Sequence, residues 1–432
     1  MSGKTNIDTT ILTGWFKDRF GSDGSILPMT EDYTKLSKHI GFNEDLLLGE
    51  KITQPIRTAS SSGFTFAGAT IATGTMFALK APNSPTHVEA SWTSMEFVLR
   101  ERTSWKSMRA ASSSEQSFGK IYDEVVKNMR DIAQYVRDLC LLHGSSTLGK
   151  IESYTGTSTT RVWTLTLADT NAGIWYPLNN ALLDTVEAYG GTVVNTTQTE
   201  GGSDMLRIVS VDTDASGKVL LAVSGNATDL TAIDADITAG TSYIILHGSN
   251  GSMMVGLNGV VDATSYAGVS VTDYPQWGTS SLNAQAAGAT FSKIMHALRK
   301  NKLKSGSGRR TALLSDATML DIVDNLSALQ RGDKNGGKFT LGADEVLYEA
   351  PGLNVSFECN PLQREGQVLL LDYSVMERIG STDLTFDPTG MEKYFEAVSG
   401  YAGQEMICYW DQALKVDKPN TITVLTNVVN TY

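Results

Sequence analysis

The sequence predicts an α+β protein assembled from segments of different character, and three observations lead to this prediction. Residues 118–144 have the pattern of one long amphipathic helix, residues 150–248 have the pattern of many short strands, and helices alternate with strands again after residue 289. The 432 residues are enough for two or three domains with cores of their own. With 41% hydrophobic and 19% charged residues, the composition is that of a globular protein.

Charge and cysteine usage exclude several classes of function. The formal net charge of −12 argues against bulk attraction to nucleic acid or to an anionic membrane. Cys140, Cys359 and Cys408 are far apart and form no CxxC pair, so we expect reduced, buried thiols and synthesis in a cytosol. The first ten residues lack the basic and apolar parts of a secretory signal, and the uncharged stretch 58–79 is too rich in Ser, Thr and Gly to span a bilayer. We therefore expect no membrane contact.

The long helix carries a single apolar stripe. Ser112 and Glu115 have the spacing of a capping box at its start, and Gly144 supplies a stop. At about 1.5 Å per residue the helix is about 40 Å long, which is more than one compact core requires. Its mixed-charge surface predicts a rod that lies across a sheet or along a domain edge. Apolar residues recur at intervals of three or four, namely Phe118, Ile121, Val125, Met129, Ile132, Val136 and Leu139.

Residues 51–111 precede this rod and predict an extended arm. "KITQPIRTAS" reads as a strand, and "ASWTSMEFVLRER" alternates like a half-solvated strand. The stretch between them is rich in Gly, Ser and Thr, yet it holds too many large apolar groups for a solvated tether. We therefore expect it to pack on a neighbouring subunit. The apolar residues are Phe64, Phe66, Met76, Phe77 and Leu79.

Residues 150–248 predict an all-β module, either a small barrel or a sandwich. The strings "RVWTLTL", "MLRIVSV", "KVLLAVS" and "SYIILHG" are separated by turn residues at short intervals. Because helices return after it, the module has the character of an insertion. Within it, "DTDASGKV" at Asp212 resembles the opening of a calcium loop, and it is either a plain hairpin turn or a weak cation site.

No active site is apparent, so we predict that the protein is not an enzyme and has no catalytic, cofactor-binding or metal-binding residues. None of the five histidines lies in an HExxH motif, and there is no GxSxG elbow or phosphate-binding P-loop. The basic string "RKNKLKSGSGRR" at Arg299 has two interpretations. It contacts phosphate or an acidic neighbour, or it is a helix end whose cations oppose the helix dipole.

The order of these parts resembles the major capsid protein family of tailed bacteriophages, with the Hong Kong-97-type fold. "GLNGVVD" at Gly256, "TALLSDATMLDIVDNL" and the closing "KPNTITVLTNV" add to the resemblance, which covers nearly all of the chain outside residues 150–248. The resemblance implies the following division: an N-terminal arm at 1–50, the E-loop at 51–111, the spine helix of the P domain at 112–149, an inserted β-rich domain at 150–248, an A domain with P-domain segments at 249–400, and closing P-domain strands at 401–432.

The resemblance also implies a function. The chain would assemble into hexamers and pentamers of an icosahedral shell that encloses double-stranded DNA without sequence-specific binding, in a virion assembled in the host cytoplasm. The implied partners are other copies of the chain, a portal protein, a decoration protein and a separate scaffolding protein, because only about fifty residues precede the E-loop. Two alternatives stay open: a cargo-enclosing nanocompartment shell of the same fold, and a hydrolase with a β accessory domain.

Overall fold

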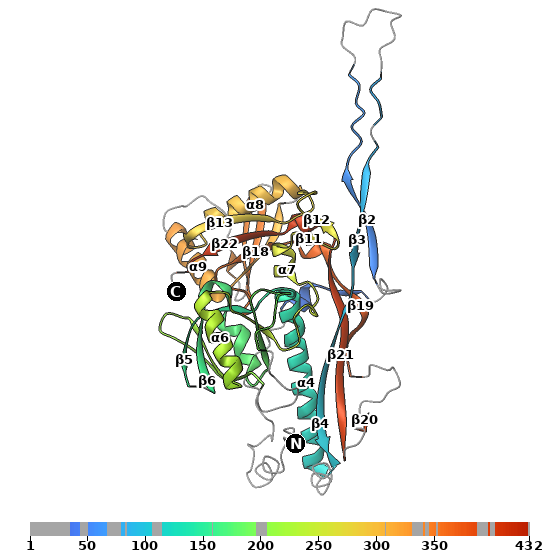
Figure 1. The fold of residues 1–432 in the computed structure, drawn as a ribbon. Coiled ribbons are helices and arrows are strands. Elements are labelled where there is room, and N and C mark those ends of the chain that lie inside the picture. The colour runs from blue at the N-terminus through green and yellow to red at the C-terminus, as the bar shows by residue number, and fades with distance from the viewer. Residues whose placement is uncertain are drawn as a thin grey trace, which may run out of the picture.

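The computed structural model describes residues 35–43, 51–66, 79–82, 84–105, 115–157, 159–195, 205–306, 308–330, 340–341, 345–350, 353–386, 396–397 and 402–430. The described part is α+β, as predicted, with helices and five separate sheets. Figure 1 shows a body from which one two-stranded hairpin projects far to one side. The shape follows from the way the chain divides its strands among sheets.

The projecting hairpin consists of β2 (Ile52–Ala59) and β3 (Thr86–Trp92), which pair antiparallel from Ile52 opposite Trp92 to Ala59 opposite Thr86. The sequence predicted one strand over "ASWTSMEFVLRER", but the structure divides it. After β3 ends, β4 (Met95–Ser104) begins and pairs with a strand of the body instead. The apolar positions shift by one at the break, from Val88, Ala90 and Trp92 to Met95, Phe97 and Leu99, so the sequence held a signal that the single-strand prediction overlooked.

The rod is helix α4 (Glu115–His143), and it runs along a five-stranded sheet (Figure 1). Met129 and Ala133 of α4 are buried against Met406 and Cys408 of the sheet, so the expected placement of the rod across a sheet is confirmed. Helix α2 (Leu36–His39) precedes the sheet in the chain. The strands of this sheet are β1 (Phe42–Asn43), β4, β19 (Met376–Thr385), β20 (Glu396–Ala397) and β21 (Gly403–Val416).

The β-rich segment forms a six-stranded sheet in the order β7-β10-β5-β6-β9-β8. Its two outer strands meet, because Leu182 bridges to Arg207 and the Ile208 N–H donates to the Ala181 carbonyl at 3.1 Å. The sheet therefore closes into a small barrel, one of the two forms expected. Its strands are β5 (Gly149–Gly156), β6 (Thr160–Leu165), β7 (Leu183–Val186), β8 (Arg207–Thr213), β9 (Val219–Ser224) and β10 (Tyr243–Leu246).

The prediction that this segment is all β was wrong, because it contains helix α6 (Ala227–Ala239). Asn226 caps the helix by accepting a hydrogen bond from the Thr228 N–H, and Gly240 ends it with φ 74°. Leu230, Ile233 and Ile237 are all buried, and their spacing is helical. The Thr and Asp residues between them obscured a pattern that the sequence did contain.

The string "DTDASGKV" is a hairpin turn, which confirms the first of its two interpretations. Strands β8 and β9 pair antiparallel on either side of it. The Asp214 carboxylate accepts hydrogen bonds from the Ser216 and Lys218 N–H groups at 2.8 and 2.9 Å, and Gly217 adopts φ 79°.

A seven-stranded mixed sheet forms the other part of the body, in the order β13-β22-β18-β14-β17-β16-β15. Helices α8 (Phe291–Ser305) and α9 (Asp316–Gln330) cover one face, where Ile294 and Leu298 pack with Phe357 (Figure 1). The sheet strands are β13 (Ser280–Ala287), β14 (Arg309–Leu314), β15 (Thr340–Leu341), β16 (Glu345–Ala350), β17 (Leu353–Cys359), β18 (Val368–Leu371) and β22 (Thr423–Val428). The short elements are α5 (Ala172–Trp175), α7 (Leu257–Asp262), β11 (Ser265–Tyr266), β12 (Val269–Ser270), and the 3₁₀ turns η1 (Leu167–Asp169), η2 (Tyr176–Leu178), η3 (Tyr373–Val375) and η4 (Pro419–Thr421).

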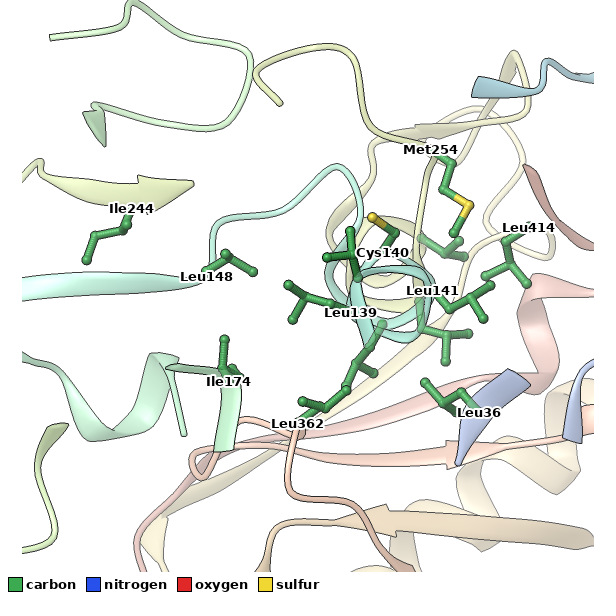
Figure 2. Close-up of a cluster of buried hydrophobic side chains, with 14 of the residues drawn as sticks. Leu36, Leu139, Cys140, Leu141, Leu148, Ile174, Ile244, Met254, Leu362 and Leu414 are labelled. Carbon is green, nitrogen blue, oxygen red and sulfur yellow. The ribbon is translucent and has the colours of Figure 1, made fainter. Parts of the chain in front are cut away.

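The C-terminal end of α4 is the hub of the largest core. Four consecutive residues, Leu139 to Leu142, are buried, so the single apolar stripe predicted for the rod does not hold in its last turns. In Figure 2, Leu139, Cys140 and Leu141 lie among side chains from the N-terminal segment, the barrel segment, the five-stranded sheet and the loop after β17. The surrounding residues include Leu36, Leu148, Ile174, Ile244, Met254, Leu362 and Leu414. The barrel therefore shares its core with the rest of the body.

Glycine allows the end of α4 to touch the start of α7 backbone to backbone. The Gly256 N–H donates to the Gly144 carbonyl at 2.9 Å. A methyl group on Gly256 would lie 2.4 Å from the Cys140 carbonyl oxygen and 2.5 Å from the Gly144 nitrogen. Only a residue without a side chain fits at this crossing.

Candidate inter-subunit surfaces

The tip of the hairpin holds the most exposed apolar group of side chains in the described structure. Phe64, Phe66 and Leu79 are 65%, 90% and 76% exposed. The two arms still touch there, because the Lys80 N–H donates to Thr65 Oγ1 at 2.9 Å. Met76 and Phe77, which the sequence placed in the same contact group, lie outside the described residues.

Among the residues that the structure describes, none forms a second layer over most of the hairpin. Ile52, Ile56 and Val88 are half-buried against the core, while most other side chains of β2 and β3 are exposed. A lone two-stranded ribbon is marginally stable in water and leaves unpaired backbone groups along its outer edges. The ribbon is therefore a surface that a further layer of protein would complete.

An aromatic cluster fixes the base of the hairpin to the body. The Trp92 indole N–H donates to the Tyr266 hydroxyl at 3.0 Å, and that hydroxyl also accepts from the Val416 N–H at 3.1 Å. The Trp277 ring stacks on Tyr266 with the ring centroids 6.2 Å apart. The Tyr266 hydroxyl donates in turn to the Leu414 carbonyl at 3.3 Å. Burial raises the pKa of Tyr266, so the hydroxyl stays protonated and keeps this donated hydrogen bond. The direction in which the hairpin projects is thus set by buried, directional contacts.

Sequence reasoning missed this cluster. Trp92 ends one strand, and its partner Tyr266 follows 174 positions later in a segment without a motif. The only signal was the presence of large aromatic residues at a strand end and in an uncharged loop, and such residues are common in any core.

The residues predicted to pack the spine helix are placed as follows. Met129 and Val136 are buried, and Val125 and Ile132 are half-buried against the same cores. The side chains of Phe118 and Ile121 lie outside the described residues, although both positions belong to α4. The four described side chains join the helix to the β4–β21 sheet and to the hub.

A buried polar clamp holds the N-terminal segment on α4. The fully buried Asp138 carboxylate accepts hydrogen bonds from the Leu36 and Ser37 N–H groups at 3.1 and 3.2 Å. Beside it, Arg378 donates to the Ile40 carbonyl at 2.8 Å and pairs with Asp383 at 3.1 Å. Burial works to raise the pKa of Asp383, but Arg378, the Leu384 N–H and Arg137 together hold it below its ordinary value.

Two buried titratable groups near the end of α4, His143 and Cys140, are poorly suited to act as a base or a nucleophile. Burial, and then the charge of Arg364, lower the pKa of His143 to about 3, and its ring donates to the Leu362 carbonyl and accepts from Asn258 Nδ2. Burial raises the pKa of Cys140 to about 12, so this thiol is a poor nucleophile. Among the described residues no group of His, Cys, Asp and Glu is placed to hold a metal ion, and no helix is long and apolar enough to cross a membrane.

The raised pKa of Glu365 predicts how the stability of the protein depends on pH. Burial, and then the nearby Asp316, raise the pKa of Glu365 from 4.5 to about 7. The folded state therefore binds more protons than the unfolded state between these values, so stability falls as pH rises from about 4.5 through about 7. We expect Glu365→Gln to abolish this part of the pH dependence and to melt about 2 °C above the wild type at pH 8. Calorimetry of both proteins at pH 5 and pH 8 checks it, and identical pH dependences would refute it.

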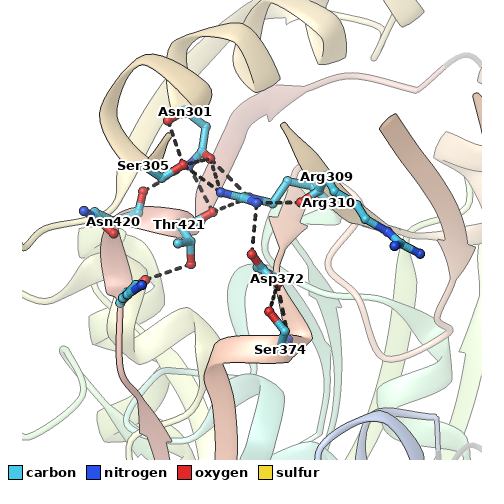
Figure 3. Close-up of polar contacts among 9 residues, drawn as sticks. Asn301, Ser305, Arg309, Arg310, Asp372, Ser374, Asn420 and Thr421 are labelled. Atoms are coloured by element: carbon cyan, nitrogen blue, oxygen red, sulfur yellow. Dashed lines mark hydrogen bonds and ion pairs between the residues drawn. The ribbon is translucent and has the colours of Figure 1, made fainter. Parts of the chain in front are cut away.

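Part of the basic string at Arg299 makes contacts within the chain. Lys302 and Lys304 lie in the last turn of α8, and Gly306 caps it with φ 79°, as the helix-end interpretation expected. Arg310, however, is buried rather than solvated. Figure 3 shows its guanidinium bonded to Asn301 and the Thr421 carbonyl and paired with Asp372 at 3.0 Å, which ties α8 and η4 to the sheet.

No protein-family model matches the sequence, and no curated protein sequence matches it. Solved structures do match. The capsid chain of cyanophage A-1(L) is 11% identical, with 99% of this chain and 97% of that chain covered at a TM-score of 0.49. The capsid chain of cyanophage P-SCSP1u is 11% identical, with coverages of 97% and 95% and a TM-score of 0.46.

The chain resembles phage capsid chains. The SrpI encapsulin of Synechococcus elongatus also matches, over 40% of this chain and 60% of its own, at 13% identity and a TM-score of 0.27. Because each of these TM-scores lies below 0.5, the function proposed next rests on contacts within the chain itself.

Proposed function

We propose that the chain is the major capsid protein of a tailed bacteriophage, which assembles into hexamers and pentamers of an icosahedral shell around double-stranded DNA. One observation carries the proposal: a rigidly based hairpin ends in exposed Phe64, Phe66 and Leu79, and no described part of its own chain covers them. These apolar side chains would be buried by contact with a second subunit. In this proposal the hairpin is the E-loop of residues 51–111.

The energetics favour a receiving subunit. Burying each of the three tip side chains contributes about 1.5–3 kcal/mol before ordering costs. Ordering a glycine-rich tip offsets much of this, but the aromatic cluster at Trp92 already fixes the base of the hairpin, so less freedom is lost on contact. Closed symmetry then repeats a modest contact over every subunit of a shell.

The other elements are those expected of a rigid shell subunit. In the proposal, α4 is the spine helix of residues 112–149, and the segment held by Asp138 belongs to the N-terminal arm of residues 1–50. The barrel belongs to the inserted domain at 150–248, and the seven-stranded sheet forms most of the A domain at 249–400, with the closing strands at 401–432. The hub of Figure 2 packs these parts on one shared core, so a mechanical force on one part is transmitted to the others.

The charge of the chain is compatible with this role. A net charge of −12 gives packaged DNA little general attraction to the shell, so the DNA is enclosed and not bound in a sequence-specific way. A separate scaffolding protein, a portal protein and a decoration protein are the proposed partners, and the virion is the proposed location, with assembly in the host cytoplasm.

The test is assembly of the full chain. We expect the protein, produced together with its phage's scaffolding protein, to give closed spherical particles in negative-stain electron microscopy, and particles from infected cells to contain double-stranded DNA. A protein that stays monomeric under every condition would contradict the proposal. Closed shells that carry a protein cargo and no DNA would support the nanocompartment instead.

A further inference from the structure

Positive charge is concentrated in one part of this acidic chain. From residue 274 to residue 315 there are seven lysines and arginines and no aspartate or glutamate. The rest of the chain therefore holds 28 cations against all 47 carboxylates. Within this segment, β13 is an edge strand of the seven-stranded sheet, α8 packs on one face of the sheet, and β14 is its central strand.

Several of these cations bind backbone carbonyls of their own chain. Lys293 donates to the carbonyls of Ala284 and Gly288, and Lys300 donates to the Ser281 carbonyl at 2.7 Å. Lys304 reaches the Gly278 and Thr279 carbonyls. These bonds hold α8 against β13 and the turn before it, but a carbonyl does not neutralise an ammonium group. These hydrogen bonds therefore leave the positive charges of Lys293, Lys300 and Lys304 in place.

The outward side of α8 combines this charge with an exposed apolar anchor. Leu303 is 83% exposed, and Arg299 and His296 are exposed at helical spacing from it. Arg309, just beyond the helix, is exposed too, and Figure 3 shows it pointing away from the buried Arg310 network. Among the described residues, no carboxylate forms an ion pair with Arg299 or Arg309. We call His296, Arg299, Leu303 and Arg309 the α8 outer face.

We propose that the α8 outer face is a contact surface for a second copy of this chain, which presents carboxylates around an apolar recess for Leu303. Charge complementarity points to a second copy, because the chain outside residues 274–315 carries a large excess of carboxylates. An exposed leucine within a ring of charges has the composition of an interface anchor with a polar rim. A nucleic acid would pair with the arginines but would gain nothing from Leu303.

The contact is of the head-to-tail kind, in which different surfaces of two identical chains meet. Such contacts close into rings when the rotation allows it. This inference rests on the proposed function, because rings of five and six copies require a head-to-tail contact. It adds a second contact that is distant in sequence from the hairpin tip and differs from it in kind, since the tip is apolar and the α8 outer face is basic.

Two variants of the full chain test the proposal. We expect Leu303→Ser to weaken association between copies about 10- to 100-fold, which corresponds to burial of one leucine. We expect Arg299→Glu to weaken it about 10-fold and to lose most of that effect when salt is raised from about 0.05 M to about 0.5 M. Sedimentation velocity over a concentration series measures both. Because both residues are exposed, neither change should lower the melting temperature of the free subunit.

Matched controls and a cross-link separate this contact from general effects. Val209→Ser removes an exposed apolar side chain from the barrel, and Arg130→Glu reverses an exposed cation that already pairs with Asp131; both should associate like the wild type. A carbodiimide, which couples lysines to carboxylates without a spacer, should join Lys300 or Lys302 to a carboxylate of another copy. Mixing isotopically heavy and light protein before coupling identifies such links between copies by mass spectrometry.

The outcomes are distinct. The inference is overturned if Leu303→Ser and Arg299→Glu associate like the wild type and no cross-link forms between copies. In that case, closed shells of the wild type would still support the proposed function. Normal association combined with reduced DNA retention in purified particles overturns it in favour of a nucleic-acid surface. If the wild type itself never forms shells, the proposed function fails, and a salt-sensitive association lost in Leu303→Ser would still support the contact.

Discussion

Replacing Phe64 and Phe66 together with serine is expected to abolish shell assembly and leave the free subunit folded. The two rings are 65% and 90% exposed in the free chain, so their removal costs the monomer almost nothing. If both are buried in a neighbouring subunit, their loss removes about 3–6 kcal/mol from each contact and lowers its association constant about 100-fold or more. Electron microscopy under assembly conditions measures the loss of particles, and calorimetry measures the fold.

The control for this variant is Val209→Ser, which replaces an apolar side chain of comparable exposure on the barrel. It should assemble normally. Limited proteolysis adds an independent measurement, because free subunits should be cut within the segment 58–86 and assembled shells should be protected there. Assembly of the double-serine variant at wild-type concentration, or equal cleavage in both states, would show that the tip is an ordinary surface loop.

Gly256→Ala is expected to produce a large loss of stability. The added methyl group meets three backbone atoms, the Cys140 oxygen at 2.4 Å, the Gly144 nitrogen at 2.5 Å and the Leu141 oxygen at 2.9 Å. Backbone cannot rotate away as a side chain can, so α4 and α7 must separate inside the hub. We expect a loss of about 3 kcal/mol or more, seen as a lower melting temperature and a lower yield of soluble protein.

Gly41→Ala is the matched control. A methyl group on Gly41 meets nothing within 4 Å, and its backbone does not occupy the left-handed region. It should therefore melt within about 1 °C of the wild type, because the added methyl group has no steric cost in the folded state and makes the unfolded chain only slightly stiffer. Equal melting temperatures for Gly256→Ala and the wild type would show that the hub tolerates separation of its two backbones.

The features that could be predicted from the sequence were single helices and strands. The features that were missed are contacts between residues far apart in the chain. The alternation of Met95, Phe97 and Leu99 was enough to predict β4, and the stripe through Met129 was enough to predict the rod. The exposure of Phe64 and Phe66 also followed from local composition, because nothing near them supplied a core.

The missed features required contacts that no local pattern encodes. A run such as Leu139 to Leu142 indicates that a helix end is apolar, but it does not indicate which distant segments pack against it. The contact between Trp92 and Tyr266 joins segments whose only common property is their place in the fold. The crossing at Gly144 and Gly256 likewise exists only because α7 returns to the end of α4 after the barrel.

The closure of the barrel has a consequence for the fidelity of assembly. A cell that makes a shell protein produces many identical chains at once, and any strand left open invites a neighbour to add to it in an unintended register. In the described barrel, the bridge from Leu182 to Arg207 joins the strands that would otherwise offer such a template. At this seam the two end strands pair with each other, so fewer backbone groups are open to chance pairing between nascent chains.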